Sequence, residues 1–71
     1  MIITKQEKSI GKKIKKFRRS AKLTQQELAD KAGLAAKYIE FIETGRRIPS
    51  LKALHKIAKA LKVKISDFLT F

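Results

Sequence analysis

The chain has 71 residues, a mass of 8.1 kDa and a formal charge of +12, which allow one small domain over residues 1–71 and exclude a multi-domain enzyme. It has no cysteine and one histidine, His55, which excludes disulfides and cysteine or histidine metal clusters, so we expect neither a metal nor a cofactor. Apolar runs of at most three residues leave no membrane span, so we expect a cytoplasmic, helix-rich domain with a polyanionic partner.

The most basic part of the chain is its first third, where residues 1–22 contain nine Lys or Arg and a single acid, Glu7. Apolar residues recur there at intervals of four, three and four: Ile10, Ile14, Phe17 and Ala21. This spacing predicts a helix over about 5–20, opened by a capping box of Thr4 and Glu7. The basic residues on its other faces form either a simple solvated surface or one that attracts a polyanion at long range.

A second, shorter helix is predicted after Thr24. The Thr24 side chain can accept from the amide of Glu27 while the Glu27 carboxylate reaches back to Thr24, which is a capping box. Gly33 suits the left-handed geometry in which helices often end, so the helix is about eight residues long. Its inner face consists of small or branched apolar residues: Leu28, Ala29 and Ala32.

A third helix is predicted over about 36–44, after a three-residue turn. Ile39 and Ile42 repeat at helical spacing, and Gly45 is a second glycine stop. A basic loop that contains Arg46 and Arg47 follows. The second and third helices are therefore both short, and a tight glycine turn connects them.

Two further helices complete the predicted domain. Ser50 is a good N-cap for a fourth helix over 51–61, whose apolar residues recur at helical spacing. Ser66 and Asp67 are expected to cap a last short helix that contains Phe68 and Leu69. Five short helices with no repeat, linker or low-complexity tract predict a single all-α domain.

A family pattern is carried by three groups of residues: Leu23-Thr24-Gln25-Gln26-Glu27-Leu28-Ala29, Ala32-Gly33-Leu34, and Tyr38-Ile39 with Ile42-Glu43-Thr44-Gly45-Arg46. It closely resembles the Cro and phage-repressor type helix-turn-helix family of xenobiotic-response-element-like regulators. Pro49-Ser50-Leu51 and residues 57–61 are similar to that family's fourth helix, so the resemblance covers nearly the whole chain. It implies a compact five-helix lambda-repressor-like DNA-binding domain. The short length is also similar to small restriction-modification controller proteins and Cro-like regulators.

The resemblance places base contacts on the outer face of the third helix, at Ala35, Ala36, Lys37 and Phe41, and a phosphate contact on Gln25. Lys37 can donate to guanine O6 or N7, and Ala36 or Phe41 can touch a thymine methyl. Further phosphate contacts are expected at Tyr38, Thr44, Arg46 and Arg47, and the alternative for the two arginines is a minor-groove contact. The resemblance also implies an internal, structural ion pair between Arg18 and Glu43.

Several of these positions have a second interpretation. Phe41 can pack against Lys37 or a neighbouring molecule, Tyr38 can be a partly buried filler, and Glu40 can either accept from cytosine or turn away from phosphates. His55 is expected to be a surface residue. Ala35 stands where the family usually has Ser or Thr, so the third helix lacks a cap at a cost of about 1 kcal/mol.

The function predicted from these features is that of a sequence-specific regulator of transcription that binds double-stranded DNA in the prokaryotic cytosol or nucleoid, or is encoded by a phage. The acids are accounted for by caps, by the ion pair or by separate helices, so no catalytic group is expected. One alternative is an antitoxin-type interaction module that autoregulates through the same motif. Another is a nonspecific binder of RNA or membrane surfaces through the basic first helix.

A homodimer is expected because the chain ends in more large apolar side chains than one short helix can hide. The interface is assigned to Phe68, Leu69 and Phe71. Phe68 or Leu69 can instead pack back onto the fourth helix. A dimer places two recognition helices about 34 to 36 Å apart, which predicts a near-palindromic operator.

Overall fold

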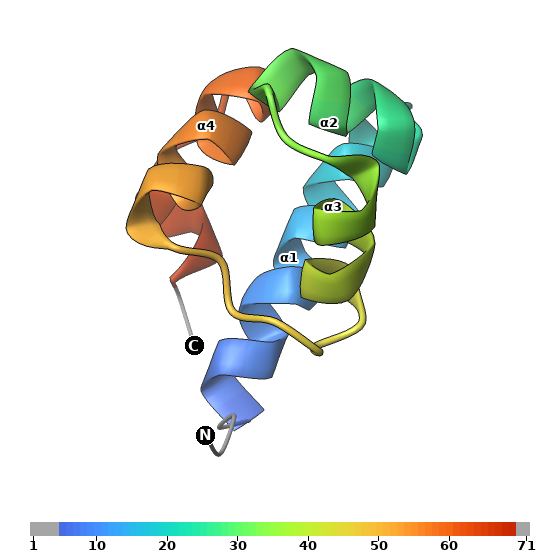
Figure 1. Cartoon of the computed structure of the whole chain (residues 1–71). Coiled ribbons are helices and arrows are strands. Elements are labelled where there is room, and N and C mark those ends of the chain that lie inside the picture. Colours follow the sequence, from blue (N-terminus) through green and yellow to red (C-terminus); the bar gives the residue numbers. More distant parts are fainter. Residues whose placement is uncertain (1–4, 70–71) are drawn as a thin grey trace.

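The computed structural model describes residues 5–69, with side chains from Ser9 onward, and every regular element in this part of the chain is a helix (Figure 1). Its elements are α1 (Lys5–Ser20), α2 (Gln25–Ala32), α3 (Ala36–Glu43), α4 (Leu51–Leu61) and the short 3-10 helix η1 (Ile65–Phe68). The all-α prediction is confirmed. Helices α1, α2 and α4 have the expected bounds, whereas α3 ends one residue early with Thr44 as its C-cap. The expected N-cap of α1, Thr4, lies outside the described residues.

The helices surround one core, in which α2 packs against both α3 and α4, and α1 lies against α3 (Figure 1). The fully buried large side chains come from all four α-helices and η1: Ile14, Leu28, Ile39, Ile42, Ile57 and Phe68. Ala21, expected on the inner face of α1, is exposed, because the helix ends at Ser20 and the chain turns there.

Helix α2 is capped at both ends by its own sequence. The Glu27 amide donates to Thr24 Oγ1 over 3.0 Å, and the Thr24 amide donates to Glu27 Oε1 over 2.8 Å. Gly33 has φ +69°, and the Leu34 amide donates to the Ala29 carbonyl over 2.9 Å, which closes the helix and aims the chain into α3.

Helix α3 begins without such support. Its N-cap residue, Ala35, has extended backbone and offers no side-chain hydrogen bond. Its inner residues Ile39, Ile42 and Glu43 are buried, so α3 is held by tertiary contacts. At Gly11, α1 approaches α3 so closely that a Cβ there would overlap the carbonyl oxygen of Ile42.

The carboxy-terminal segment differs from the sequence prediction in two ways. Ser66 lies inside η1, and the N-cap position belongs to Lys64, whose amide donates to Asp67 Oδ2 over 3.0 Å. Phe68 has no exposed surface and meets the ring of Phe17 edge-on at 5.6 Å between centroids, so it belongs to the core. Its assignment to a dimer interface is therefore wrong. Leu69 remains 43% exposed.

Candidate nucleic-acid interface

The surface of interest is built on the pair α2 and α3, which Figure 1 labels and which the segment that begins at Gly33, the C-cap of α2, connects. The inner face of α3 is committed to the core through Ile39 and Ile42, which turns the opposite face outward. Ala35 and Lys37 are exposed, and Ala36 and Phe41 are half-buried. Of the four expected base-contacting residues, Lys37 and Phe41 therefore lie on the outer side of α3, Ala35 precedes the helix as its N-cap, and Ala36 packs in part against the core.

A buried ion pair ties this unit to α1. Arg18 Nε donates to Glu43 Oε2 over 2.6 Å and Arg18 Nη2 donates to Glu43 Oε1 over 3.0 Å, which is the two-pronged geometry that arginine and carboxylate favour. Arg18 Nη1 also donates to the Leu23 carbonyl over 2.7 Å. Gln25 Nε2 donates to Glu43 Oε1 over 3.1 Å. One carboxylate therefore holds α1, the start of α2 and the end of α3 together.

Gln25 keeps part of its hydrogen-bonding capacity within this network. One amide hydrogen is directed at Glu43, and an amide group has two hydrogens, so a second donor remains for an anion. Thr44 differs, because its hydroxyl donates to the Glu40 carbonyl over 2.9 Å. A hydroxyl has one hydrogen, so Thr44 must rotate before it can donate to a phosphate.

Three side chains of the outer face interact with one another. Lys37 Nζ lies 3.2 Å from Glu40 Oε2, and their side chains are 72% and 42% exposed. The same ammonium lies 5.6 Å from the centre of the Phe41 ring. The Phe41 ring therefore lies beside Lys37 and also reaches the surface.

The basic loop after α3 folds back on that helix. The amides of Arg46 and Arg47 both donate to the Phe41 carbonyl, over 2.8 and 3.1 Å. The Arg46 guanidinium lies 5.8 Å from the Phe41 ring centre, and the Arg47 guanidinium lies 5.7 Å from that of Tyr38. Both side chains are exposed, so the loop presents two arginines beside the outer face of α3.

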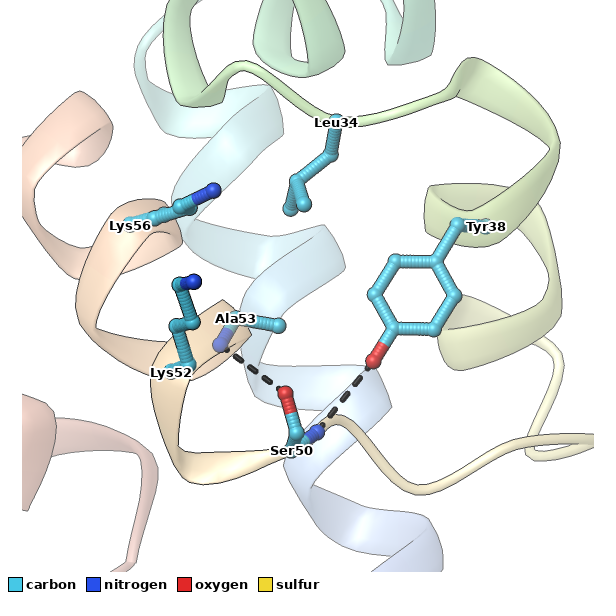
Figure 2. Close-up of a pocket in the computed structure, with 6 residues that line it drawn as sticks. All are labelled: Leu34, Tyr38, Ser50, Lys52, Ala53 and Lys56. Carbon is cyan, nitrogen blue, oxygen red and sulfur yellow. Dashed lines mark hydrogen bonds between the residues drawn. The ribbon is translucent and has the colours of Figure 1, made fainter.

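Tyr38 connects α3 to the start of α4, as Figure 2 shows. Its hydroxyl oxygen accepts from the Ser50 amide over 3.2 Å, and the hydroxyl hydrogen is left for another acceptor. Beside it lies a hollow of about 290 Å³, which Lys52 and Lys56 line together with Leu34 and Ala53 (Figure 2). The two lysines enlarge the cationic surface around Tyr38.

Sequence reasoning did not select Lys52 and Lys56. The available signal was their spacing of four residues on a helix capped by Ser50, which places both on one exposed face. Within residues 9–69 the side chains form no cluster of three possible metal ligands among His, Cys, Asp and Glu. No helix in the described part of the chain combines the length and apolar character needed to cross a membrane.

Comparison with known proteins gives a consistent result. The Helix-turn-helix family model matches residues 14–68. An uncharacterized HTH-type transcriptional regulator from Archaeoglobus fulgidus is 42% identical over 59 residues, which are 83% of each chain. The immunity repressor protein of Bacillus phage phi105 is 43% identical over 58 residues, which are 82% of this chain and 40% of the repressor.

Solved structures of transcriptional regulators share this fold. The chain is similar to SinR, the master regulator for biofilm formation, in complex with DNA, with a TM-score of 0.83, 35% identity and coverage of 86% of this chain and 98% of that one. It is also similar to the restriction-modification controller protein C.AhdI from Aeromonas hydrophila, with a TM-score of 0.83, 30% identity and coverage of 89% and 94%.

Proposed function

The chain belongs to the helix-turn-helix family of DNA-binding transcriptional regulators, and we propose that it acts as a homodimer that inserts α3 into the major groove of a near-palindromic operator. The observation that carries this proposal is the outer face of α3, which is exposed and flanked by cations while the inner face is fixed in the core. A major groove about 12 Å wide admits such a helix.

Base contacts are assigned to the outer side of α3. Lys37 donates to a guanine, and Phe41 or Ala36 lies against a thymine methyl. Ala35 and Ala36 bring no hydrogen-bonding side chain, so the polar part of the recognition rests on few residues. The close approach of the small Ala35 and Ala36 lets the helix backbone lie near the bases.

Phosphate contacts surround this face. They are assigned to Gln25, Tyr38, Thr44, Arg46 and Arg47, and to the two lysines of the hollow, Lys52 and Lys56. Tyr38 supports its assignment with a free hydroxyl hydrogen between Arg47 and the lysines. These residues come from α2, α3, the loop and α4, so they can follow a phosphate backbone on either side of the groove.

The dimer interface is assigned to Leu69 and to Phe71, which lies outside the described residues. Leu69 is exposed at the end of η1, whereas Leu51, 65% exposed at the start of α4, is not assigned to the interface. Apolar side chains of this size on the surface of a small domain favour an interface. Half-sites are then expected about 10 to 10.5 base pairs apart.

The primary experiment selects bound sequences from a random DNA pool and then measures affinity for the best site against salt. Affinity should fall by about 0.9 log units per log unit of salt for each phosphate neutralised. Arg46→Ala and Arg47→Ala should each flatten the slope by about one phosphate equivalent and weaken all sequences alike. Lys16→Ala, an exposed α1 position outside the proposed interface, is the matched control. Recovery of no preferred sequence, or better competition by RNA, would overturn the proposal.

The homodimer is tested separately by sedimentation and by shift assays. The double variant Leu69→Ala, Phe71→Ala should sediment as a monomer at concentrations where the parent is a dimer, and should lose affinity for the full operator while it keeps a half-site. Leu51→Ala is the control for a second exposed leucine. A parent monomer that binds one half-site as tightly as the full operator contradicts the dimer.

A further inference from the structure

The outer side of α3 carries one acid, Glu40, within a surface that is otherwise neutral or cationic. An isolated carboxylate there would be repelled by DNA phosphates. Glu40 is not isolated, because its Oε2 lies 3.2 Å from Lys37 Nζ. The pair therefore places a hydrogen-bond donor and an acceptor side by side on the face proposed to enter the groove.

The position of Lys37 in this pair is supported from a second side. Its ammonium lies 5.6 Å from the Phe41 ring centre, and the Arg46 guanidinium lies 5.8 Å from the same centre. The Lys37 side chain is 72% exposed, so its ammonium lies next to Glu40 and Phe41 and stays accessible to a ligand. Lys37 is thus directed along the outer side of α3 by two neighbours on its own helix.

The spacing of the two charged atoms matches the edge of a base pair. In a G·C pair, cytosine N4 donates to guanine O6 at the usual separation of about 2.9 to 3.0 Å. In the major groove guanine shows the acceptors N7 and O6 and cytosine shows the N4 hydrogen. An ammonium over N7 and O6 with a carboxylate over N4 satisfies all three groups at once.

We propose that Lys37 and Glu40 act as one unit that reads a single G·C base pair in one orientation, with Lys37 donating to guanine and Glu40 accepting from cytosine N4. This inference rests on the proposed function and identifies Glu40 as a specificity-determining residue. An A·T pair presents acceptor, donor and acceptor in that order, so it meets the ammonium with a donor at the second position. A reversed C·G pair places its amino group under the ammonium.

The first test changes the protein. Glu40→Ala should lower the preference for G·C over the other pairs about tenfold at one operator position, and Lys37→Met should lower it at the same position. Glu40→Gln keeps an acceptor, so it should retain part of the preference. Both Glu40 variants lose the same charge, and Asp30→Ala on α2 is the charge-matched control, which should change affinity without changing base preference.

The second test changes the DNA and leaves the parent protein intact. In N4-methylcytosine at the assigned position, a methyl group replaces the major-groove hydrogen of N4, which is the hydrogen proposed to be donated to Glu40. It should weaken binding of the parent about tenfold and leave binding of Glu40→Ala nearly unchanged. The inference is overturned if the modified DNA binds the parent equally well, or if Glu40→Ala keeps every base preference. If the parent selects no sequence at all, the proposed function itself fails.

Discussion

Helices α2 and α3 have eight residues each and lie next to each other, yet they are specified in different ways. Helix α2 has a complete capping box at Thr24 and a glycine end at Gly33, so its limits are written in its local sequence. Helix α3 starts at Ala35 without a side-chain cap and relies on burial and on the Glu43 ion pair. Helix α2 is encoded by its local sequence, whereas α3, the proposed recognition helix, is positioned by the rest of the fold.

This contrast has a physical basis. Each helix buries three of its eight residues, so the two helices differ in how their ends are capped and not in how many residues are packed. In α3 three buried residues provide the attachment, and two of them are simple hydrophobic contacts. The third, Glu43, is both buried and charged. Its replacement should therefore show most clearly that α3, unlike α2, depends on tertiary contacts.

The largest expected effect comes from Glu43→Ala. Removal of one partner from a buried ion pair leaves Arg18 uncompensated and costs about 3 to 5 kcal/mol in free energy of unfolding. Urea titration of the parent and variant measures this loss. A loss as small as that of a helix cap would show that α3 does not depend on the pair.

A second effect follows from the contact between α1 and α3. Gly11→Ala introduces a methyl group that overlaps the Ile42 carbonyl, and overpacking of this kind costs about 1 to 3 kcal/mol. Thermal unfolding should show the loss, together with weaker operator binding because α3 is displaced. Lys12→Ala, at the exposed neighbouring position, is the control and should leave stability nearly unchanged. Equal stability of the two variants would contradict the close approach.

The smallest effects concern the caps, where the two helices should respond with opposite signs. Thr24→Ala removes the cap of α2 and should destabilise the domain by about 1 kcal/mol. Ala35→Ser supplies the missing cap of α3 and should stabilise it by about 1 kcal/mol. The denaturant midpoints of the two variants and the parent, measured under identical conditions, check both changes in stability. If Ala35→Ser brings no gain, the start of α3 is already satisfied by tertiary contacts.

The sequence predicted the features that depend on neighbouring residues better than those that depend on long-range contacts. The limits of α2 and α4 could be predicted because Thr24, Gly33 and Ser50 act on their immediate neighbours. The pair of Arg18 and Glu43 is separated by 25 positions, and only the family resemblance implied it. Phe68 was misplaced because its environment depends on Phe17, which is far away in the sequence.

The candidate site was predictable to a similar degree. Spacing identified the outer side of α3, because Ile39 and Ile42 fix which side turns inward. The contribution of Lys52 and Lys56 depends on how α4 lies beside Tyr38, and no local pattern encodes that arrangement. The short-range pair of Lys37 and Glu40 was open to prediction from spacing but requires rotamers that a sequence does not show.

The close approach at Gly11 has a consequence for redesign. At Gly11 the main chain of α1 contacts the main chain of α3. The position of α3 is therefore set by atoms that a side-chain substitution on its outer side does not remove. Lys37, Glu40 and Phe41 can therefore be varied together while the position of α3 stays constant. A library restricted to these three positions should yield folded regulators with new operators, all bound to DNA in the same orientation.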